Sequence, residues 1–357
     1  MENFIYQANP SRVIFGSGTI QKLPEELSRL GLSKPLLLCT PQQTSQAADL
    51  EKILGGKVAG TFSRATMHTP VEVTEEALEV LKSTGADSLV AIGGGSTTGL
   101  GKALSIRTGL YHICIPTTYA GSEVTPILGE TQAGLKKTRS DPKILPGTVI
   151  YDVDLTMTLP ASLSATSGVN AIAHSVEALY AQNGNPIINL LAQEGVRALA
   201  AALPAIVADP SSREARSSAL YGAWLCGICL GNAGMSLHHK LCHTLGGTFD
   251  LPHAETHTVV LPHALAYNAP KVPRAMKMLA DVLPGSDGDA IRGLNLLLDK
   301  LGVKRGLKDF GMKEADVDRA AELATSNAYP NPRELEQGPI RELIRRAWAG
   351  EHAKADL

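Results

Sequence analysis

The sequence predicts a chain of two parts, an α/β domain built on a mostly parallel sheet and then an all-helical domain. Three observations lead to this prediction. The 357 residues suffice for two domains of roughly 150 residues each. Short β-rich runs alternate with helical stretches up to about residue 155, and they cease from Ser162 onward. We place the boundary near Leu159–Pro160, which gives domains 1–159 and 160–357.

Four apolar runs in the first part have the length and the flanks of buried strands. Between them lie periodic segments such as Val73–Ser83, with the apolar spacing of an amphipathic helix. Strands that alternate with helices form a mostly parallel sheet covered on both faces. In the second part, Leu190–Val207 and Ala290–Leu301 have helical periodicity. The four predicted strands are Pro35–Cys39, Ser88–Ile92, His112–Ile115 and Thr148–Tyr151.

Composition excludes several classes of function. The chain has 33 basic and 35 acidic residues and a net charge of -2, so it offers no broad basic field for nucleic acid. No apolar run reaches the roughly 18 residues of a membrane span, and the N-terminus has no export signal. Five scattered cysteines, including Cys226 and Cys229, fit reduced thiols. We therefore expect a cytoplasmic protein that binds neither nucleic acid nor membrane.

A glycine-rich turn follows the predicted strand Ser88–Ile92. Gly93, Gly94 and Gly95 let a ligand approach the backbone, and a helix that begins at Ser96 presents free N–H groups to an anion such as a pyrophosphate. The run is not the G-x-G-x-x-G fingerprint and, taken alone, is equally compatible with a tight turn.

Two further turns favour a nucleotide site. Thr117, Thr118 and Ser122 follow the strand His112–Ile115, and their hydroxyls can reach a ligand at the carboxyl edge of the sheet. A third turn begins at Thr40 and contains no acid, although NAD-selective sites place one there for the ribose. We predict a Rossmann-like domain with Gly94, Gly95 and Ser96 at the phosphates, which accepts NADH or NADPH.

Histidines concentrate in the second part. His239 and His243 are four residues apart, so both imidazoles lie on one helix face. We expect Gly246–Gly247 to end this helix and His253 to lie on a loop that folds back. Asn170 and His174 form a second pair with the same spacing. Two such pairs can converge on one point, as in a divalent metal site or a proton-transfer site.

Long strings in the sequence resemble a known family. GGGSTTGLGKA, PTTYAGSEVTPILG, HHKLCHTLGG and NPRELEQGPIRELIRRAWAG are similar to the iron-containing alcohol dehydrogenase superfamily, and within it to the maleylacetate reductase subgroup. The resemblance covers essentially the whole chain. It implies the dehydroquinate synthase-like fold, with an N-terminal nucleotide-binding domain, a C-terminal helical domain and a homodimeric assembly.

The departures from the family pattern concern the metal site. Metal-dependent members hold iron or zinc at the positions of Asn170, His174, His239 and His253, with an aspartate where this chain has Asn170. Without that carboxylate the site is degenerate, because three imidazoles and an amide oxygen bind a divalent cation less tightly. We therefore expect that no metal is required. Gly99 also replaces the aspartate of the wider family's glycine motif.

The resemblance implies reduction of the C=C bond of maleylacetate to 3-oxoadipate in the catabolism of aromatic compounds. It implies that His243 lies beside the nicotinamide and that His243 and His253 supply hydrogen bonds or the proton, with the other three family positions completing the pocket. Expected cationic contacts are Lys136 to the cofactor and Lys240 and Arg333 to the dicarboxylate substrate; Arg139 is a weaker candidate, and nothing local requires Arg333.

Other interpretations of the sequence stay open. A metal-dependent alcohol or polyol dehydrogenase is the nearest, and a dehydroquinate-synthase-like lyase is more distant because the cations that such a site needs are missing. A nucleotide-binding regulatory protein with an inactive site is the non-enzymatic alternative.

Overall fold

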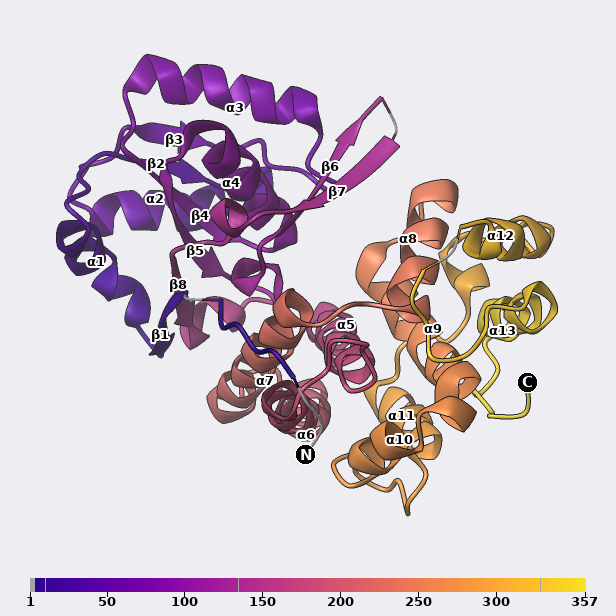
Figure 1. Ribbon diagram of the computed structural model, residues 1–357. Coiled ribbons are helices and arrows are strands. Elements are labelled where there is room, and N and C mark those ends of the chain that lie inside the picture. Colours follow the sequence, from indigo (N-terminus) through magenta and orange to yellow (C-terminus); the bar gives the residue numbers. More distant parts are fainter. Residues whose placement is uncertain (1–3, 10, 134, 328) are drawn as a thin grey trace. The chain divides into compact units, whose positions relative to one another are not determined.

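The computed structural model describes residues 4–9, 11–133, 135–327 and 329–357 (Figure 1). The chain divides into two compact units, an α/β unit from Ala8 to Leu159 and a helical unit from Pro160 to Leu357. The helical unit also includes the N-terminal segment that ends at Gln7, which the sequence analysis assigned to the first domain. The predicted fold class is confirmed.

A six-stranded parallel sheet forms the centre of the α/β unit, in the order β1-β8-β5-β4-β2-β3. The four predicted strands are β2, β4, β5 and β8. Two edge strands and the β6–β7 hairpin were missed, because they are short or exposed and have little apolar patterning. The strands are β1 Arg12–Gly16, β2 Pro35–Leu38, β3 Gly60–Phe62, β4 Ser88–Gly93, β5 Tyr111–Pro116, β6 Ile127–Gln132, β7 Leu135–Ser140 and β8 Thr148–Asp152.

Helices cover both faces of this sheet. On one face, Leu23 and Leu50 of α1 and α2 pack in a buried cluster with sheet residues such as Val90 and Ile113. Helix α4 packs on the opposite face. A Cβ at its Gly101 would lie 2.2 Å from Nε2 of His112 on β5, so the helix backbone lies close to the sheet. The helices of this unit are α1 Leu23–Arg29, α2 Thr44–Ile53, α3 Val71–Thr84 and α4 Gly95–Thr108.

The helical unit contains nine α-helices in its described residues, and none of these residues forms a strand. Local signals set helix starts: the Asn185 side chain accepts hydrogen bonds from the first N–H groups of α6. The helices are α5 Ala161–Ala178, α6 Pro186–Ala208, α7 Arg213–Asn232, α8 Leu237–Phe249, α9 His253–Asn268, α10 Pro273–Ala280, α11 Ala290–Leu301, α12 Asp316–Thr325 and α13 Gln337–Ala349.

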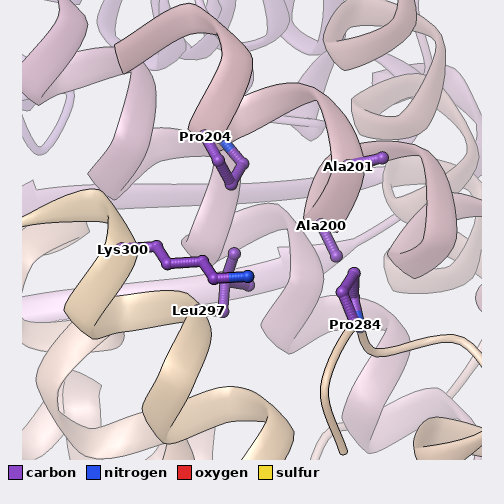
Figure 2. Close-up of a pocket in the computed structure, with 6 residues that line it drawn as sticks. All are labelled: Ala200, Ala201, Pro204, Pro284, Leu297 and Lys300. Carbon is purple, nitrogen blue, oxygen red and sulfur yellow. The ribbon is translucent and has the colours of Figure 1, made fainter. Parts of the chain in front are cut away.

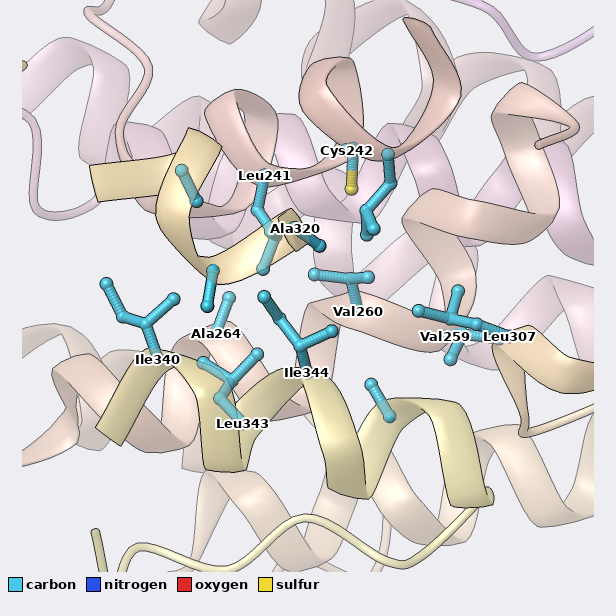
Figure 3. Close-up of a cluster of buried hydrophobic side chains, with 14 of the residues drawn as sticks. Leu241, Cys242, Val259, Val260, Ala264, Leu307, Ala320, Ile340, Leu343 and Ile344 are labelled. Carbon is cyan, nitrogen blue, oxygen red and sulfur yellow. The ribbon is translucent and has the colours of Figure 1, made fainter. Parts of the chain in front are cut away.

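An apolar core anchors the two helices that carry most of the histidines. Leu241 of α8 and Val260 of α9 pack with Ala320 of α12 and with Leu343 and Ile344 of α13 (Figure 3). All five of these side chains are nearly inaccessible to water. Burial of this size fixes α8 and α9 against each other, because each large aliphatic side chain contributes about 2 kcal/mol when fully buried.

One helix of the described chain, α6, is long and apolar enough by composition to cross a membrane. Half of its most apolar window is buried inside the helical unit, where α6 packs against α5 and α7. A Cβ at Gly168 of α5 would lie 2.5 Å from the Leu203 side chain of α6, so the two backbones approach closely. This burial is the pattern of a core helix.

Candidate active site

One candidate site lies at the carboxyl edge of the sheet in the α/β unit. The ends of β4 and β5 are in register, with Gly93 opposite Pro116. The N–H of Thr117 donates to the Gly93 carbonyl over 3.0 Å, so the glycine turn and the threonine turn lie side by side. Thr118 lies against the backbone of Gly94, where a Cβ would come within 3.1 Å of its side chain.

Gln43, which was not among the predicted site residues, connects the third turn to this pair of turns. Its Nε2 donates to Oγ1 of Thr117 over 3.0 Å, and its Oε1 accepts from the Thr40 hydroxyl over 3.0 Å. A Cβ at Gly93 would lie 2.4 Å from that Oε1, so only glycine fits at this position. The T-P-Q-Q run, a capping box, was the available signal.

The start of α4 has the properties expected of an anion-binding turn. The helix begins at Gly95, one residue before the predicted Ser96, and its N-cap residue Gly94 has no side chain to cap the first N–H groups. The hydroxyl of Thr97 is buried and has no hydrogen-bond partner in the structure. Buried hydroxyls are normally satisfied, so these groups fit a bound polar ligand.

Two other predicted cofactor residues have different outcomes. Ser122 follows Gly121, which has a φ of 76°, and its Oγ accepts a hydrogen bond from Lys102 over 3.2 Å. The hydroxyl hydrogen of Ser122 is therefore available to a ligand. The backbone of Lys136 pairs with Thr131 in the hairpin, but its side chain lies outside the described residues.

Another candidate site is a group of buried polar side chains in the helical unit. Asn170 and His174 lie on α5, and His239 and His243 lie on α8. The rings of His174 and His239 are 5.2 Å apart, and those of His239 and His243 are 6.3 Å apart. The two predicted pairs therefore bring their histidines together.

Two local predictions around this group are wrong. Gly246–Gly247 does not end the helix, which continues to Phe249 and stops at Asp250 in the left-handed conformation. His253 is not on a loop but is the first residue of α9, with Pro252 as its N-cap. The apolar contacts of α8 and α9 override the helix-weakening effect of the two glycines.

Glu177, one turn beyond His174 on α5, is the buried carboxylate of this cluster, and the sequence analysis missed it. Its carboxylate accepts a 2.7 Å hydrogen bond from Nδ1 of His239. It also accepts from the backbone N–H groups of Ser236 and His238 at the start of α8, over 2.9 and 2.8 Å. Because Nδ1 of His239 donates this hydrogen bond, Nε2 is the nitrogen that can accept one.

Burial keeps most of these histidines neutral. Desolvation, followed by the neighbouring histidines, holds the pKa of His174 and of His257 well below the ordinary value. The same effect lowers the pKa of His238 to about 4. Burial is the largest single influence on Glu177 and would raise its pKa, but the hydrogen bond from His239, the nearby His239 and His238 rings and the Ser236 N–H together outweigh it and lower that pKa. At neutral pH, neutral imidazoles of His174, His238 and His257 therefore lie in the same cluster as this carboxylate.

His238 and His257 also belong to the cluster. The only sequence feature that indicated His257 was its i, i+4 spacing from His253. His238, His239 and His257 offer nitrogens that all lie within 4.8 Å of one another. However, Nε2 of His238 donates to the His257 carbonyl over 3.0 Å, and its Nδ1 lies 3.4 Å from Nδ1 of His239. Both nitrogens of His238 therefore have partners within the cluster, whereas both nitrogens of His257 and Nε2 of His239 are buried without a hydrogen-bond partner.

Three of the four predicted family metal positions have buried polar atoms without a partner. Oδ1 of Asn170, Nδ1 of His174 and Nε2 of His239 are all buried without a hydrogen-bond partner. Such orphaned atoms indicate a polar ligand, but the donors are neutral, and the carboxylate of Glu177 is occupied by His239 and the start of α8. Without an anionic ligand the set binds a divalent cation less tightly than a set with a carboxylate would, and it also fits a hydrogen-bonding ligand.

The two predicted substrate cations differ in their surroundings. The Arg333 guanidinium stacks 4.1 Å from the Tyr267 ring and donates to the carbonyls of Tyr267 and Leu357. The expectation that nothing requires Arg333 is thus wrong, because it holds the C-terminal segment. Lys240 lies on α8 with its ammonium 5.7 Å from the Tyr329 ring, next to His239 in the chain.

Two cavities lie away from this chemistry. One, of about 220 Å³, is lined mainly by apolar side chains of α6 and α11 (Figure 2). The other, of about 450 Å³, lies beside the β6–β7 hairpin, where Arg107 and Arg139 are both paired with Glu130. Neither contains a residue of the histidine cluster or of the three turns. The first cavity is lined by Ala200, Ala201, Pro204, Pro284, Leu297 and Lys300.

Comparisons with known proteins agree with this arrangement. The family model for iron-containing alcohol dehydrogenase matches residues 10–153, and the model for the C-terminal part of the Fe-containing alcohol dehydrogenase family matches residues 164–348. A maleylacetate reductase of Pseudomonas sp. (strain P51) is 53% identical over 98% of this chain and 99% of that protein. The crystal structure of maleylacetate reductase from Agrobacterium tumefaciens has a TM-score of 0.95 at 52% identity. That from Rhizobium sp. strain MTP-10005 has a TM-score of 0.94, also at 52% identity. Each structural match covers 99% of this chain and 100% of the other.

Proposed function

Because the chain belongs to the iron-containing alcohol dehydrogenase family, we propose that it is a maleylacetate reductase. In this role it reduces the C=C bond of maleylacetate with NADH or NADPH and yields 3-oxoadipate. The observation that carries the proposal is the sequence identity to maleylacetate reductases, 53% and 52%, over essentially the full length of both chains. We also propose that the protein is cytoplasmic and that it acts in the catabolism of aromatic compounds.

The cofactor is proposed to occupy the three turns of the α/β unit. Gly94, Gly95 and Ser96 offer backbone N–H groups to the pyrophosphate, and the hydroxyls of Thr117 and Thr118 flank them. The Thr40 turn has no carboxylate to repel a 2′-phosphate, which supports acceptance of both NADH and NADPH. When bound, either cofactor supplies a hydride.

The helical unit is proposed to bind the substrate and handle its proton. Hydride adds to the olefinic carbon distant from the ketone, the C=C electron pair moves toward the ketone, and its oxygen becomes an enolate. Hydrogen-bond donors stabilise such an oxyanion. We assign this task to His243 and His253, while Asn170, His174 and His239 complete the pocket. A proton then adds to the carbon beside the ketone, so one hydride and one proton are consumed per turnover.

We propose that this reaction requires no metal. A metal-dependent alcohol dehydrogenase polarises its carbonyl with the metal, whereas a C=C bond conjugated to a ketone spreads the developing charge and needs less Lewis acidity. The orphaned Oδ1 of Asn170 and Nε2 of His239 are acceptors and suit a hydrogen-bond donor, so the donors to the oxyanion are assigned to His243 and His253. Because the family is named for its iron, the test of the proposed function includes removal of metal.

The proposed partners are the dicarboxylate substrate and a second copy of the chain. Lys240 is the proposed cation for one substrate carboxylate, while Arg139 is paired with Glu130. A homodimer is supported by the exposed apolar side chains of Phe4, Ile5 and Tyr6, which precede the edge strand β1.

The test is steady-state NADH and NADPH oxidation with maleylacetate, before and after exhaustive chelation. Undiminished turnover after chelation, with 3-oxoadipate as product, is expected. Oxidation of simple alcohols or polyols that is lost on chelation and restored by Fe²⁺ or Zn²⁺ would favour a metal-dependent dehydrogenase. Cofactor binding without turnover of either substrate would favour a regulatory protein.

A further inference from the structure

Lys102 is a fully buried lysine of α4 that the proposed chemistry does not use. Its side chain has no exposure to water, and burial lowers its pKa to about 8. A buried ammonium is costly unless hydrogen bonds satisfy it. In this protein its hydrogen bonds go to neutral oxygens of one short segment, residues 122–127.

The segment surrounds the ammonium. Nζ of Lys102 donates to the carbonyl of Ser122 over 2.5 Å and to the carbonyl of Ile127 over 2.8 Å. The Thr125 hydroxyl lies 2.9 Å away and the Ser122 hydroxyl 3.2 Å away. Four acceptors for three N–H bonds leave no donor unsatisfied. The lysine therefore holds the loop after β5 in one conformation.

The nearby acid has a different partner. Glu123 is buried in the same segment, and its Oε1 accepts a 2.8 Å hydrogen bond from the Tyr151 hydroxyl on β8. A neutral, well-packed side chain would fill a merely structural position at a lower desolvation cost. A charged group that binds the loop backbone at two carbonyls fits a position where loop geometry matters.

Both elements that Lys102 connects belong to the proposed cofactor site. The lysine lies on the helix that starts at the glycine turn, and Ser122 follows Thr117 and Thr118 on the loop that flanks this turn. Its hydrogen bond to Oγ of Ser122 also orients that hydroxyl so that its hydrogen points elsewhere. Loss of the lysine would free the loop from the helix.

We propose that Lys102 is a positioning residue for the nicotinamide cofactor. Lys102 acts indirectly, by holding Ser122 and the loop after β5 in place. This inference rests on the proposed function, because it needs NADH or NADPH to occupy the three turns. The ammonium itself does not touch the cofactor. It fixes the hydroxyls of the loop at the distance from the α4 N-terminus that a pyrophosphate requires.

The test compares Lys102→Gln, Lys102→Arg and Thr125→Ala with wild type. Thr125→Ala removes one acceptor while keeping the ammonium, and the exposed Lys82, paired with Glu79 on α3, gives the matched control Lys82→Gln. The NADH dissociation constant is measured by fluorescence titration, the thermal midpoint without cofactor by calorimetry, and kcat and both KM values by steady-state kinetics.

We expect Lys102→Gln to raise the NADH dissociation constant and the KM for NADH about tenfold, since small displacements of positioning groups are costly. The KM for maleylacetate should stay within twofold of wild type. Thr125→Ala should shift NADH binding in the same direction by a smaller factor, Lys102→Arg should restore part of it, and Lys82→Gln should change nothing.

A folded Lys102→Gln protein that binds NADH within twofold of wild type overturns the inference. If Lys102→Gln does not fold, Thr125→Ala decides, and unchanged NADH binding in that variant overturns the inference equally. Equal increases in both KM values would show general damage and also count against it. Wild-type protein that binds neither NADH nor NADPH would instead overturn the proposed function itself.

Discussion

Nδ1 of His239 donates a 2.7 Å hydrogen bond to the buried carboxylate of Glu177. The same carboxylate accepts from backbone N–H groups at the start of α8, so one side chain sets both the helix start and the orientation of the ring. Outer hydrogen bonds of this kind fix which nitrogen of a histidine faces a site. In this cluster they leave Nε2 without a hydrogen-bond partner.

Replacement of Glu177 by alanine should therefore destabilise the protein strongly. The change leaves the His239 ring and several N–H groups buried without an acceptor, which costs about 3 to 5 kcal/mol. Glu177→Gln should cost less, because its amide oxygen still accepts a hydrogen bond. Urea unfolding measures the difference, with the exposed Glu214→Ala as control. A loss of under about 1 kcal/mol in Glu177→Ala would contradict this account.

Asn170→Asp should convert the cluster into a metal site. An aspartate adds an anionic oxygen beside the unpartnered nitrogens of His174 and His239, so affinity for Zn²⁺ should rise at least about tenfold. Metal content after dialysis against Zn²⁺ measures this, with Asn183→Asp at an exposed site as control. Equal zinc retention in wild type and Asn170→Asp would show that the missing carboxylate does not limit binding.

His243→Ala should lower kcat by about 100-fold, because proton transfer by a placed side chain typically contributes that much. The NADH dissociation constant should change much less than kcat, since the proposed contacts to the cofactor phosphates are on the three turns of the α/β unit and not on α8. His352→Ala is the control, because His352 is exposed and pairs with Asp299. Full turnover in His243→Ala would remove this residue from the mechanism.

Substitutions at Lys240 and Arg333 should affect different properties, substrate binding for Lys240 and stability for Arg333. Lys240→Gln should raise the KM for maleylacetate about tenfold, because it removes a charged hydrogen-bond donor. Arg333→Gln should leave that KM unchanged but lower the free energy of unfolding by about 1 to 3 kcal/mol, since it releases the C-terminal segment. The reverse pattern of effects would assign the anchoring role to Arg333.

Stability below pH 5 should depend on Glu26. Hydrogen bonds from Arg29, then Thr148 and Arg12, outweigh burial and lower the Glu26 pKa from 4.5 to about 2. Because the folded-state pKa is depressed, the stabilisation is complete above the unfolded pKa and is lost as pH falls from about 4.5 toward 2. Its full size is about 2 to 3 kcal/mol, reduced by the partial exposure of both arginines.

The free energy of unfolding at neutral pH and at pH values below about 4 measures this contribution. Glu26→Gln should lose stability at neutral pH and show a flatter acid dependence than wild type. The exposed Glu25, paired with Lys22, supplies the control Glu25→Gln. Parallel pH profiles for wild type and Glu26→Gln would contradict the prediction.

Strong local patterns were predictable from the sequence. The four apolar strands bury every residue or nearly so, and such runs are visible without tertiary information. The edge strands β1 and β3 were not predictable, because their pairing with β8 and β2 comes from long-range hydrogen bonds rather than from an apolar pattern. The predicted end of α8 at Gly246–Gly247 was wrong for a related reason. Core contacts with residues distant in the chain outweigh the helix-weakening effect of these two glycines.

The sequence alone determined the order of the two domains, the positions of the three turns and the paired spacing of Asn170 with His174 and of His239 with His243. These features are local, because backbone preferences and helical periodicity act over a few residues. Only the tertiary structure decided the roles of Glu177, Gln43 and Lys102. Their partners lie 20 to 74 residues away in the chain, and a hydrogen bond across such a distance leaves no periodic mark in the sequence.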